Sequence, residues 1–159
     1  MEKTYAVTPI GRIFTEAEKP YIELQRDYAR GLEAFGGFSH AVVLWWFHQS
    51  DEAPDRKVLE VRSPYRRGPG TLGTFATRSP FRPNPIAMTV SCVLEVDEAS
   101  GRLYVDYTDA LDGSPVLDIK PYTPSMDRVE APAVPAWCAH WPRSLEASEE
   151  FDWENEFNF

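Results

Sequence analysis

Met88-Thr-Val-Ser-Cys-Val-Leu-Glu-Val-Asp97 largely alternates between apolar and polar residues. After Glu98-Ala-Ser-Gly101 the alternation resumes with Leu103, Val105 and Tyr107. A period of two is typical of a β-strand with one buried face, and a short turn with glycine joins two such strands. The stretch therefore predicts a β-hairpin with one solvent-facing side.

Further strands are expected around this hairpin. The nearly all-apolar run from Phe38 to His48 fits a strand buried on both faces, and residues 5–14 and 73–77 fit shorter strands. One short amphipathic helix is expected where apolar residues recur at helical spacing, at Leu24, Tyr28, Leu32 and Phe35. We therefore predict a mainly β fold, a small and partly open β-barrel with one or two short helices.

Length and composition favour one packed domain. The chain has 159 residues, of which 43% are hydrophobic and 13% aromatic, which is too apolar for a disordered chain. We expect residues 1–130 to form the barrel and residues 131–159, a Pro-rich cover and an acidic, aromatic tail, to belong to the same domain. The longest apolar run, Ala41 to Phe47, is far shorter than the roughly 20 residues of a membrane-spanning helix. With only two cysteines and no signal-peptide pattern, the chain is expected to be soluble and cytoplasmic.

Charge is unevenly distributed along the chain. The formal net charge is −9, which argues against binding nucleic acid by bulk electrostatics. However, no Asp or Glu occurs from Val61 to Leu94, and this stretch contains Arg62, Arg66, Arg67, Arg78 and Arg82. These arginines either form an anion-attracting surface or pair with carboxylates of the protein itself.

Three common site motifs find no support. Gly68-Pro-Gly70-Thr-Leu-Gly73 has the spacing of a dinucleotide-binding loop, but Pro80, Pro83 and Pro85 exclude the helix that should follow. No spacing of His and Cys assembles three metal ligands, so we expect no metal. The sequence has no Gly-x-Ser-x-Gly elbow, so it gives no support for a hydrolase.

Two segments carry chemical information. Residues 75–86 contain three prolines that stiffen the loop, which presents Arg78, Arg82 and Asn84 for a carboxylate, a phosphate or a planar heterocycle. The alternative is a rigid turn whose arginines hold neighbouring strands. Residues 109–122 place Asp109 and Asp112 where carboxylates can accept from amines or ribose hydroxyls.

Alternatives remain open for two of these positions. Asp112 precedes a glycine, so its carboxylate can also bond backbone amides as turn residues do. His48-Gln49, at the exit of the apolar strand, fits a polar cap or a buried histidine as well as a ligand contact.

Phe-Ala-Thr-Arg-Ser-Pro-x-Arg-Pro-Asn-Pro-Ile (75–86) and Asp-Gly-Ser-Pro-Val-Leu-Asp-Ile-Lys-Pro-Tyr (112–122) resemble the TsaA-like (TrmO) family of S-adenosylmethionine-dependent tRNA methyltransferases. The likeness covers roughly residues 5–127. It implies a β-barrel methyltransferase, usually a homodimer, that methylates the exocyclic nitrogen of threonylcarbamoyl-adenosine next to the tRNA anticodon. It also implies cofactor contacts by His48, Gln49, Arg78, Met88, Asp109, Ala110, Leu111 and Asp112.

The charge distribution and the stiff loop add candidates for substrate contact, which are Arg66, Arg67, Arg82 and Asn84. Methyl transfer is an in-line displacement, so the protein chiefly has to align donor and acceptor, and no general base is assigned.

The chain departs from the family pattern in two places. The Pro-Arg-Gln loop of bacterial members is replaced by Glu18-Lys-Pro-Tyr-Ile-Glu-Leu-Gln25, and the chain ends in an acidic, aromatic tail. Both changes weaken the tRNA assignment more than the cofactor assignment. Two alternatives therefore stay open, a small-molecule methyltransferase of the same fold and a non-catalytic sensor that binds S-adenosylmethionine.

Overall fold

The structure is a computed structural model that describes residues 3–159, and the chain in it forms two compact units. The first unit contains residues 3–52 and Asn84–Arg128, and the second contains Ala53–Pro83 and Val129–Phe159. Each unit is therefore assembled from two separate stretches of sequence. The prediction of a single domain with boundaries at 1–130 and 131–159 stays a prediction.

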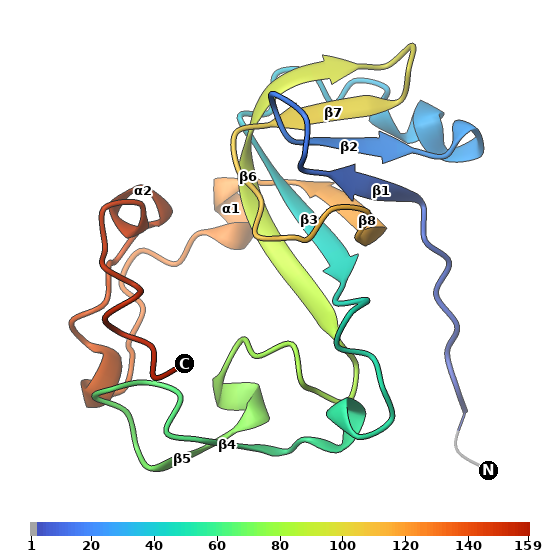
Figure 1. The fold of residues 1–159 in the computed structure, drawn as a ribbon. Coiled ribbons are helices and arrows are strands. Elements are labelled where there is room, and N and C mark those ends of the chain that lie inside the picture. The colour runs from blue at the N-terminus through green and yellow to red at the C-terminus, as the bar shows by residue number, and fades with distance from the viewer. Residues whose placement is uncertain (1–2) are drawn as a thin grey trace. The chain divides into compact units, whose positions relative to one another are not determined.

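The first unit is a ring of six antiparallel strands in the order β1-β2-β7-β6-β3-β8, in which β8 pairs back onto β1 (Figure 1). The strands are β1 Gly11–Phe14, β2 Tyr21–Leu24, β3 His40–Trp46, β6 Ile86–Asp97, β7 Arg102–Val105 and β8 Pro115–Pro121. The α-helices are short, α1 Pro124–Asp127 in this unit and α2 Leu145–Ser148 in the second. The prediction of a mainly β fold with few short helices is confirmed.

The interior of the ring is a compact apolar core. Its buried side chains come from every strand of the ring and include Ile13, Ile22, Trp45, Ala87, Leu103 and Val116. Strands β1 and β2 approach each other closely at Gly11, where a Cβ would lie 3.0 Å from the Leu24 Cα atom. Burial of these side chains supplies the main driving force for closing the ring.

The hairpin of β6 and β7 is confirmed, but the expected buried face of β6 is wrong in its first half. Thr89 and Ser91 are 7% and 2% exposed, whereas Met88, which the alternation would place inside, is 43% exposed. A register shift between Val93 and Glu95 then changes the pairing with β7. The small polar residues face inward because they hydrogen-bond groups of the ring interior.

Other elements differ from expectation in kind or extent. The amphipathic helix is a 3₁₀ helix, Arg26–Leu32, and it starts later than expected because Leu24 belongs to β2. Residues 73–77 are not a strand, since β5 is Thr71–Gly73 and a 3₁₀ helix, Thr74–Ala76, follows it. Strand β1 begins only at Gly11. Strands β2 and β8 were not predicted.

The second unit is built around aromatic rings. Strand β4, Glu60–Arg62, pairs with β5, and two further 3₁₀ helices, Asp55–Lys57 and Ala136–Cys138, belong to the unit. Tyr65 stacks on Trp137 with ring centroids 5.3 Å apart, and it contacts the rings of Trp141 and Phe157.

The C-terminal tail is docked within the second unit. The Asn158 amide donates to the Ser63 carbonyl oxygen at 2.8 Å, and the Arg66 backbone amide donates to the Glu156 carbonyl oxygen at 3.0 Å. The idea that the Pro-rich stretch covers the barrel core stays a prediction. In residues 3–159 no helix is both long and apolar enough to span a bilayer.

Candidate functional site

A loop between β7 and β8 carries four of the residues expected to bind the cofactor, and β6 holds the start of this loop. The Ser91 hydroxyl donates to the Tyr107 carbonyl oxygen at 2.6 Å, and the Thr89 hydroxyl donates to Oδ1 of Asp109. The Trp45 indole N–H in turn donates to the Thr89 oxygen at 2.9 Å. Because an indole nitrogen can only donate, the single proton of Thr89 points to Asp109 and fixes the orientation of its carboxylate.

The far end of the same loop is fastened to β1. Oδ1 of Asp112 accepts a hydrogen bond of 2.7 Å from the Thr15 backbone amide. Gly113 adopts the left-handed conformation with φ 77°, and its amide donates to the Ile13 carbonyl oxygen. Asp112 therefore does bond a backbone amide, as the turn interpretation expects, but the amide is that of Thr15, directly after the distant strand β1. This contact accounts for one of its two carboxylate oxygens.

His48 is brought to this loop from the end of β3. Its Nδ1 lies 3.3 Å from the hydroxyl oxygen of Ser114, which is fully buried directly before β8. Gln49 next to it is exposed. In the loop itself Ala110 is buried and Leu111 is exposed, so the loop offers both a packed backbone and a free apolar side chain.

Met88 lies on a different face of the sheet. It pairs with Leu44 across β3 and β6, and its neighbour Thr89 points into the ring toward Asp109. Successive residues of a strand point to opposite faces, so the Met88 side chain is on the outside of the ring. The structure therefore gathers His48 and residues 109–112, and it does not place Met88 on their side of β6.

The arginine candidates belong to the second unit. Arg78, Arg66 and Arg67 are exposed. Arg82 uses Nη2 to donate to the carbonyl oxygens of Thr74 and Thr77, at 3.1 and 3.0 Å. This contact holds the loop together, which favours the structural alternative for Arg82. Asn84 is exposed in the first unit.

Two of these arginines lie near acidic residues of the tail. Hydrogen bonds from Asn155 lower the pKa of Asp152, and the charge of Arg66 lowers it further. Burial alone would raise the pKa of Glu156, but hydrogen bonds from His140 and Trp141, together with the charges of His140 and Arg67, lower it overall. Part of the positive charge at Arg66 and Arg67 is thus balanced inside the second unit.

Tyr107 adds a proton donor to the loop. Partial burial raises the pKa of its phenol, and the negative charge of Asp109 raises it further. Tyr107 is therefore a neutral phenol at physiological pH. Sequence reasoning missed the supporting residues Trp45, Thr89 and Ser114, which belong to none of the motifs that were singled out.

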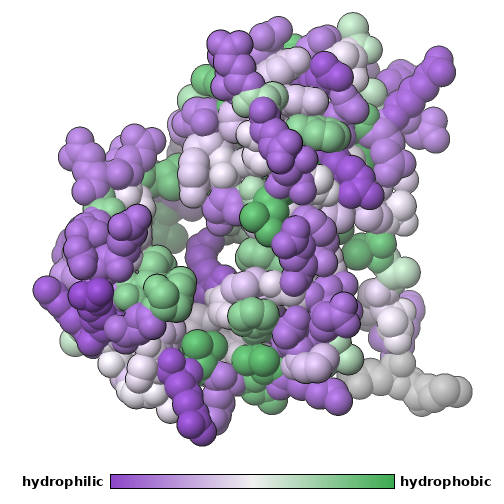
Figure 2. All heavy atoms as spheres, viewed as in Figure 1, coloured by the Kyte–Doolittle hydropathy of each residue, from purple (hydrophilic) through white to green (hydrophobic). Residues whose placement is uncertain are grey.

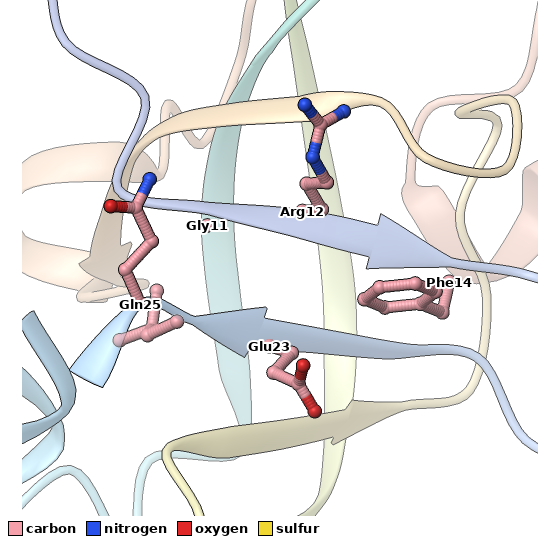
Figure 3. Close-up of a pocket in the computed structure, with 6 residues that line it drawn as sticks. Gly11, Arg12, Phe14, Glu23 and Gln25 are labelled. Carbon is pink, nitrogen blue, oxygen red and sulfur yellow. The ribbon is translucent and has the colours of Figure 1, made fainter.

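A pocket on the ring does not coincide with this loop (Figure 3). It has a volume of about 140 Å³ and is lined by Gly11, Arg12, Phe14, Glu23, Leu24 and Gln25. Ligand pockets usually measure roughly 300–1,000 Å³, so this one is too small for a nucleoside cofactor. Its charged groups are engaged, because Arg12 donates to the Gly113 carbonyl oxygen and Glu23 accepts from Arg102.

Comparison with known proteins decides the family. A model of the tRNA-methyltransferase O N-terminal domain matches residues 3–128. The chain belongs to this family. Residues 129–159, which form about half of the second unit, lie outside the match. Residues 3–159 contain no group of three or more His, Cys, Asp or Glu that could hold a metal ion.

Relatives of known name support the assignment. The chain is 42% identical over 127 residues to the tRNA (adenine(37)-N6)-methyltransferase of Escherichia coli, covering 79% of this chain and 50% of that protein. It is 43% identical over 103 residues to an S-adenosyl-L-methionine-binding protein of Archaeoglobus fulgidus, covering 65% and 68%. The chain thus spans half the length of the E. coli relative.

A solved structure shows the same fold. The crystal structure of TrmO from P. aeruginosa superposes with a TM-score of 0.66 at 33% identity, covering 86% of this chain and 62% of that one. The ring-like, mainly β architecture is therefore that of the TrmO family.

Proposed function

We propose that this protein is a methyltransferase that uses S-adenosylmethionine to methylate tRNA, at the exocyclic nitrogen of threonylcarbamoyl-adenosine next to the anticodon. The observation that carries this proposal is the 42% identity to a tRNA (adenine(37)-N6)-methyltransferase across 79% of the chain. The names of other relatives, as S-adenosyl-L-methionine-binding proteins, support the choice of cofactor.

The loop between β7 and β8 fits such a cofactor. When bound, S-adenosylmethionine supplies a methyl group on a positively charged sulfur atom, and it also carries an amine and ribose hydroxyls. Asp109 is a preoriented acceptor for these groups, because the hydrogen bond from Thr89 fixes one of its carboxylate oxygens. An acceptor that is already oriented loses little entropy when it binds a ligand.

The remaining contacts are part of the same proposal. We assign cofactor contacts to His48, Gln49, Arg78, Met88, Ala110, Leu111 and Asp112, and substrate contacts to Arg66, Arg67, Arg82 and Asn84. Asp112 offers its second carboxylate oxygen, since the first is used by Thr15. Met88 is the weakest member, because its side chain is on the other face of β6 from Asp109.

Isothermal titration with S-adenosylmethionine tests the cofactor site. We expect Asp109→Asn, Arg78→Ala and Asp112→Ala each to weaken binding at least tenfold, or about 1.4 kcal/mol. Glu98→Gln, which removes an exposed carboxylate in the β6–β7 turn, is the control and should bind as the wild type does. Wild-type protein that binds no S-adenosylmethionine would refute the cofactor, and variants with unchanged affinity would refute the residue assignments.

Mass spectrometry of tRNA nucleosides tests the reaction. Cells that lack the protein should lose the methyl mark on threonylcarbamoyl-adenosine, and purified protein with S-adenosylmethionine should restore it. An unchanged nucleoside profile contradicts the tRNA assignment.

One observation favours the alternative of a small-molecule methyltransferase. Arg66 lies near Asp152, and Arg67 lies near Glu156. These acidic neighbours weaken the attraction of the two arginines for phosphate. The two functions differ in salt dependence. Affinity for tRNA should fall steeply as salt rises if the arginines contact phosphates, and a small-molecule enzyme should bind tRNA weakly at any salt concentration.

We also propose a homodimer in the cytoplasm, without a metal ion. The cytoplasm is where tRNA is modified, and the homodimer follows from the resemblance to the family. Light scattering on the purified protein measures the mass, and a monomer would contradict the homodimer.

A further inference from the structure

We propose that Phe75 is a stacking platform for an unpaired base of the RNA substrate, an inference that rests on the proposed tRNA methyltransferase function. Phe75 lies in the 3₁₀ helix Thr74–Ala76 of the second unit, and its side chain is 80% exposed. Within residues 3–159 no other aromatic ring stacks on it. On the face of the molecule shown in Figure 2, hydrophobic residues form only small groups between hydrophilic ones. A phenylalanine this exposed adds nothing to the core.

The exposure of Phe75 is built into a rigid loop. The neighbouring Thr74 is 1% exposed, and its hydroxyl donates to the Val58 carbonyl oxygen at 3.0 Å. The Thr77 hydroxyl donates to the Thr74 carbonyl oxygen at 2.8 Å, and Arg82 donates to the same oxygen. The backbone on both sides of Phe75 is thus anchored, so the position from which the ring reaches solvent is set before any ligand arrives. Because this backbone is already ordered, only the side chain of Phe75 loses freedom on stacking.

The sequence that follows Phe75 carries the charge expected of a nucleic-acid contact, with one acidic residue, Glu60, paired to Gly73 across β4 and β5. No acidic residue occurs from Val61 to Leu94, and the exposed Arg78 follows Phe75 by three positions. Three residues span at most about 11 Å, so one nucleotide and its neighbour can reach both side chains. Single-stranded nucleic acids are bound by this combination of stacking aromatic rings and cationic groups.

An unpaired base is the required partner. In a duplex the faces of the bases are covered by their neighbours, whereas bases of a single-stranded loop can be splayed out and stacked on aromatic side chains. Phe81, which is also exposed on the same loop, offers a second ring of the same kind. The surface therefore suits the loop of an RNA hairpin and not its stem.

The test compares two RNA probes by fluorescence anisotropy, an anticodon stem–loop and a fully paired duplex of similar length. We expect Phe75→Ala to weaken binding of the stem–loop about tenfold and to leave duplex binding unchanged. Phe75→Trp should retain the affinity, and Phe75→Leu, which is apolar but has no ring, should lose it. The slope of affinity against salt should not change, because Phe75 neutralises no phosphate. Phe159→Ala is the matched control, since Phe159 is 94% exposed on the acidic tail.

The outcomes separate this inference from the proposed function. Phe75→Ala protein that binds the stem–loop as tightly as the wild type does would overturn the inference, and methyl transfer by the wild type would still stand. Stem–loop affinity that is retained in Phe75→Leu would show that an apolar side chain without a ring is enough, and a changed oligomeric mass of Phe75→Ala in solution would show a contact between protein copies. Either result would overturn the stacking role. If Phe75→Ala loses stem–loop binding but the wild type transfers no methyl group, the RNA contact stands and the proposed reaction fails.

Discussion

Each of the two units is stabilised internally in a different way. The first is a ring of paired strands around an apolar core, and its backbone hydrogen bonds close on themselves. The second has one short strand pair and a cluster of aromatic rings contributed by Tyr65, Trp137, Trp141, Trp153 and Phe157. Residues that form a sheet leave a periodic pattern in the sequence, and residues that form a cluster of rings leave none. This difference explains why the first unit was largely predictable and the second was not.

The largest effect is expected from breaking the core of the ring. Trp45 is fully buried, packs against Phe47 and holds Thr89. Trp45→Ala should lower the free energy of unfolding by about 3–5 kcal/mol, because it leaves a cavity and removes the hydrogen bond that the indole donates to Thr89. Urea denaturation followed by far-UV circular dichroism measures the change. In the second unit Trp153→Ala should cost less, because Trp153 is only half-buried. Equal losses would contradict the contrast between the units.

A smaller difference in stability is expected between alanine substitutions of two glycines, one in each unit. In Gly11→Ala the new methyl group would lie 3.0 Å from the Glu23 carbonyl carbon and clash with the carbonyl oxygen, so β1 and β2 must move apart. We expect a loss of about 1–3 kcal/mol in the free energy of unfolding. Gly70→Ala in the second unit meets no atom within 4 Å and should be neutral or stabilising by up to about 1 kcal/mol. Thermal melts of both variants measure this difference, and a stable Gly11→Ala protein would contradict the close approach of β1 and β2.

How much the sequence predicts can be seen at β6. Its alternation correctly predicts a hairpin with β7, but it assigns Thr89 and Ser91 to the solvent side, because hydroxyl residues are usually exposed. These two residues face inward to bond Asp109 and the Tyr107 carbonyl group. Such bonds depend on where a later loop packs, which no local pattern contains. Strand β8 escaped prediction for a related reason, since Pro115 and Pro121 at its ends resemble a turn.

The candidate site divides in the same way. Asp109 and Asp112 were singled out from the distinctive segment around Asp112-Gly113, whereas Ala110 and Leu111 were expected only from the resemblance to the TrmO family. Thr89 and Trp45 were not found, because they act through Asp109 and have no motif of their own. Sequence reasoning also left Arg82 open between a ligand contact and a structural role, and its bonds to Thr74 and Thr77 show that it at least has the second.

The link between core and loop gives a third prediction. Thr89→Val keeps the shape of the side chain but removes the proton that orients Asp109, so affinity for S-adenosylmethionine should fall about fivefold to tenfold, or about 1–1.4 kcal/mol. Thr89→Ser retains a hydroxyl and should restore most of the affinity in isothermal titration. Thr71→Val, at an exposed position of β5, is the control. If Thr89→Ser binds as poorly as Thr89→Val, the threonine only fills space and does not position Asp109.

The smallest effect on stability is expected from protonation of Glu156 in the C-terminal tail. The buried Glu156 accepts hydrogen bonds from His140 at 2.9 Å and from Trp141 at 2.8 Å, and its pKa lies below the usual value of 4.5. A carboxyl group whose pKa is lowered by folding stabilises the folded state above the unfolded pKa, and this contribution is lost as the pH falls through the folded pKa. The second unit should therefore lose stability below about pH 4.5, the ordinary glutamate value.

Glu156→Gln should flatten this acid dependence, because glutamine carries no charge to lose. Asp97→Asn is the matched variant in the first unit, where hydrogen bonds from Ser100 lower the pKa of an exposed carboxylate. Because solvent screens Asp97, its replacement should change the acid dependence less. Urea denaturation at several pH values, followed by near-UV circular dichroism of the tryptophan cluster, measures both variants. If Asp97→Asn flattens the dependence of stability on pH and Glu156→Gln does not, the acid sensitivity belongs to the ring of strands in the first unit. The second unit is then stabilised by its aromatic contacts without a contribution from Glu156.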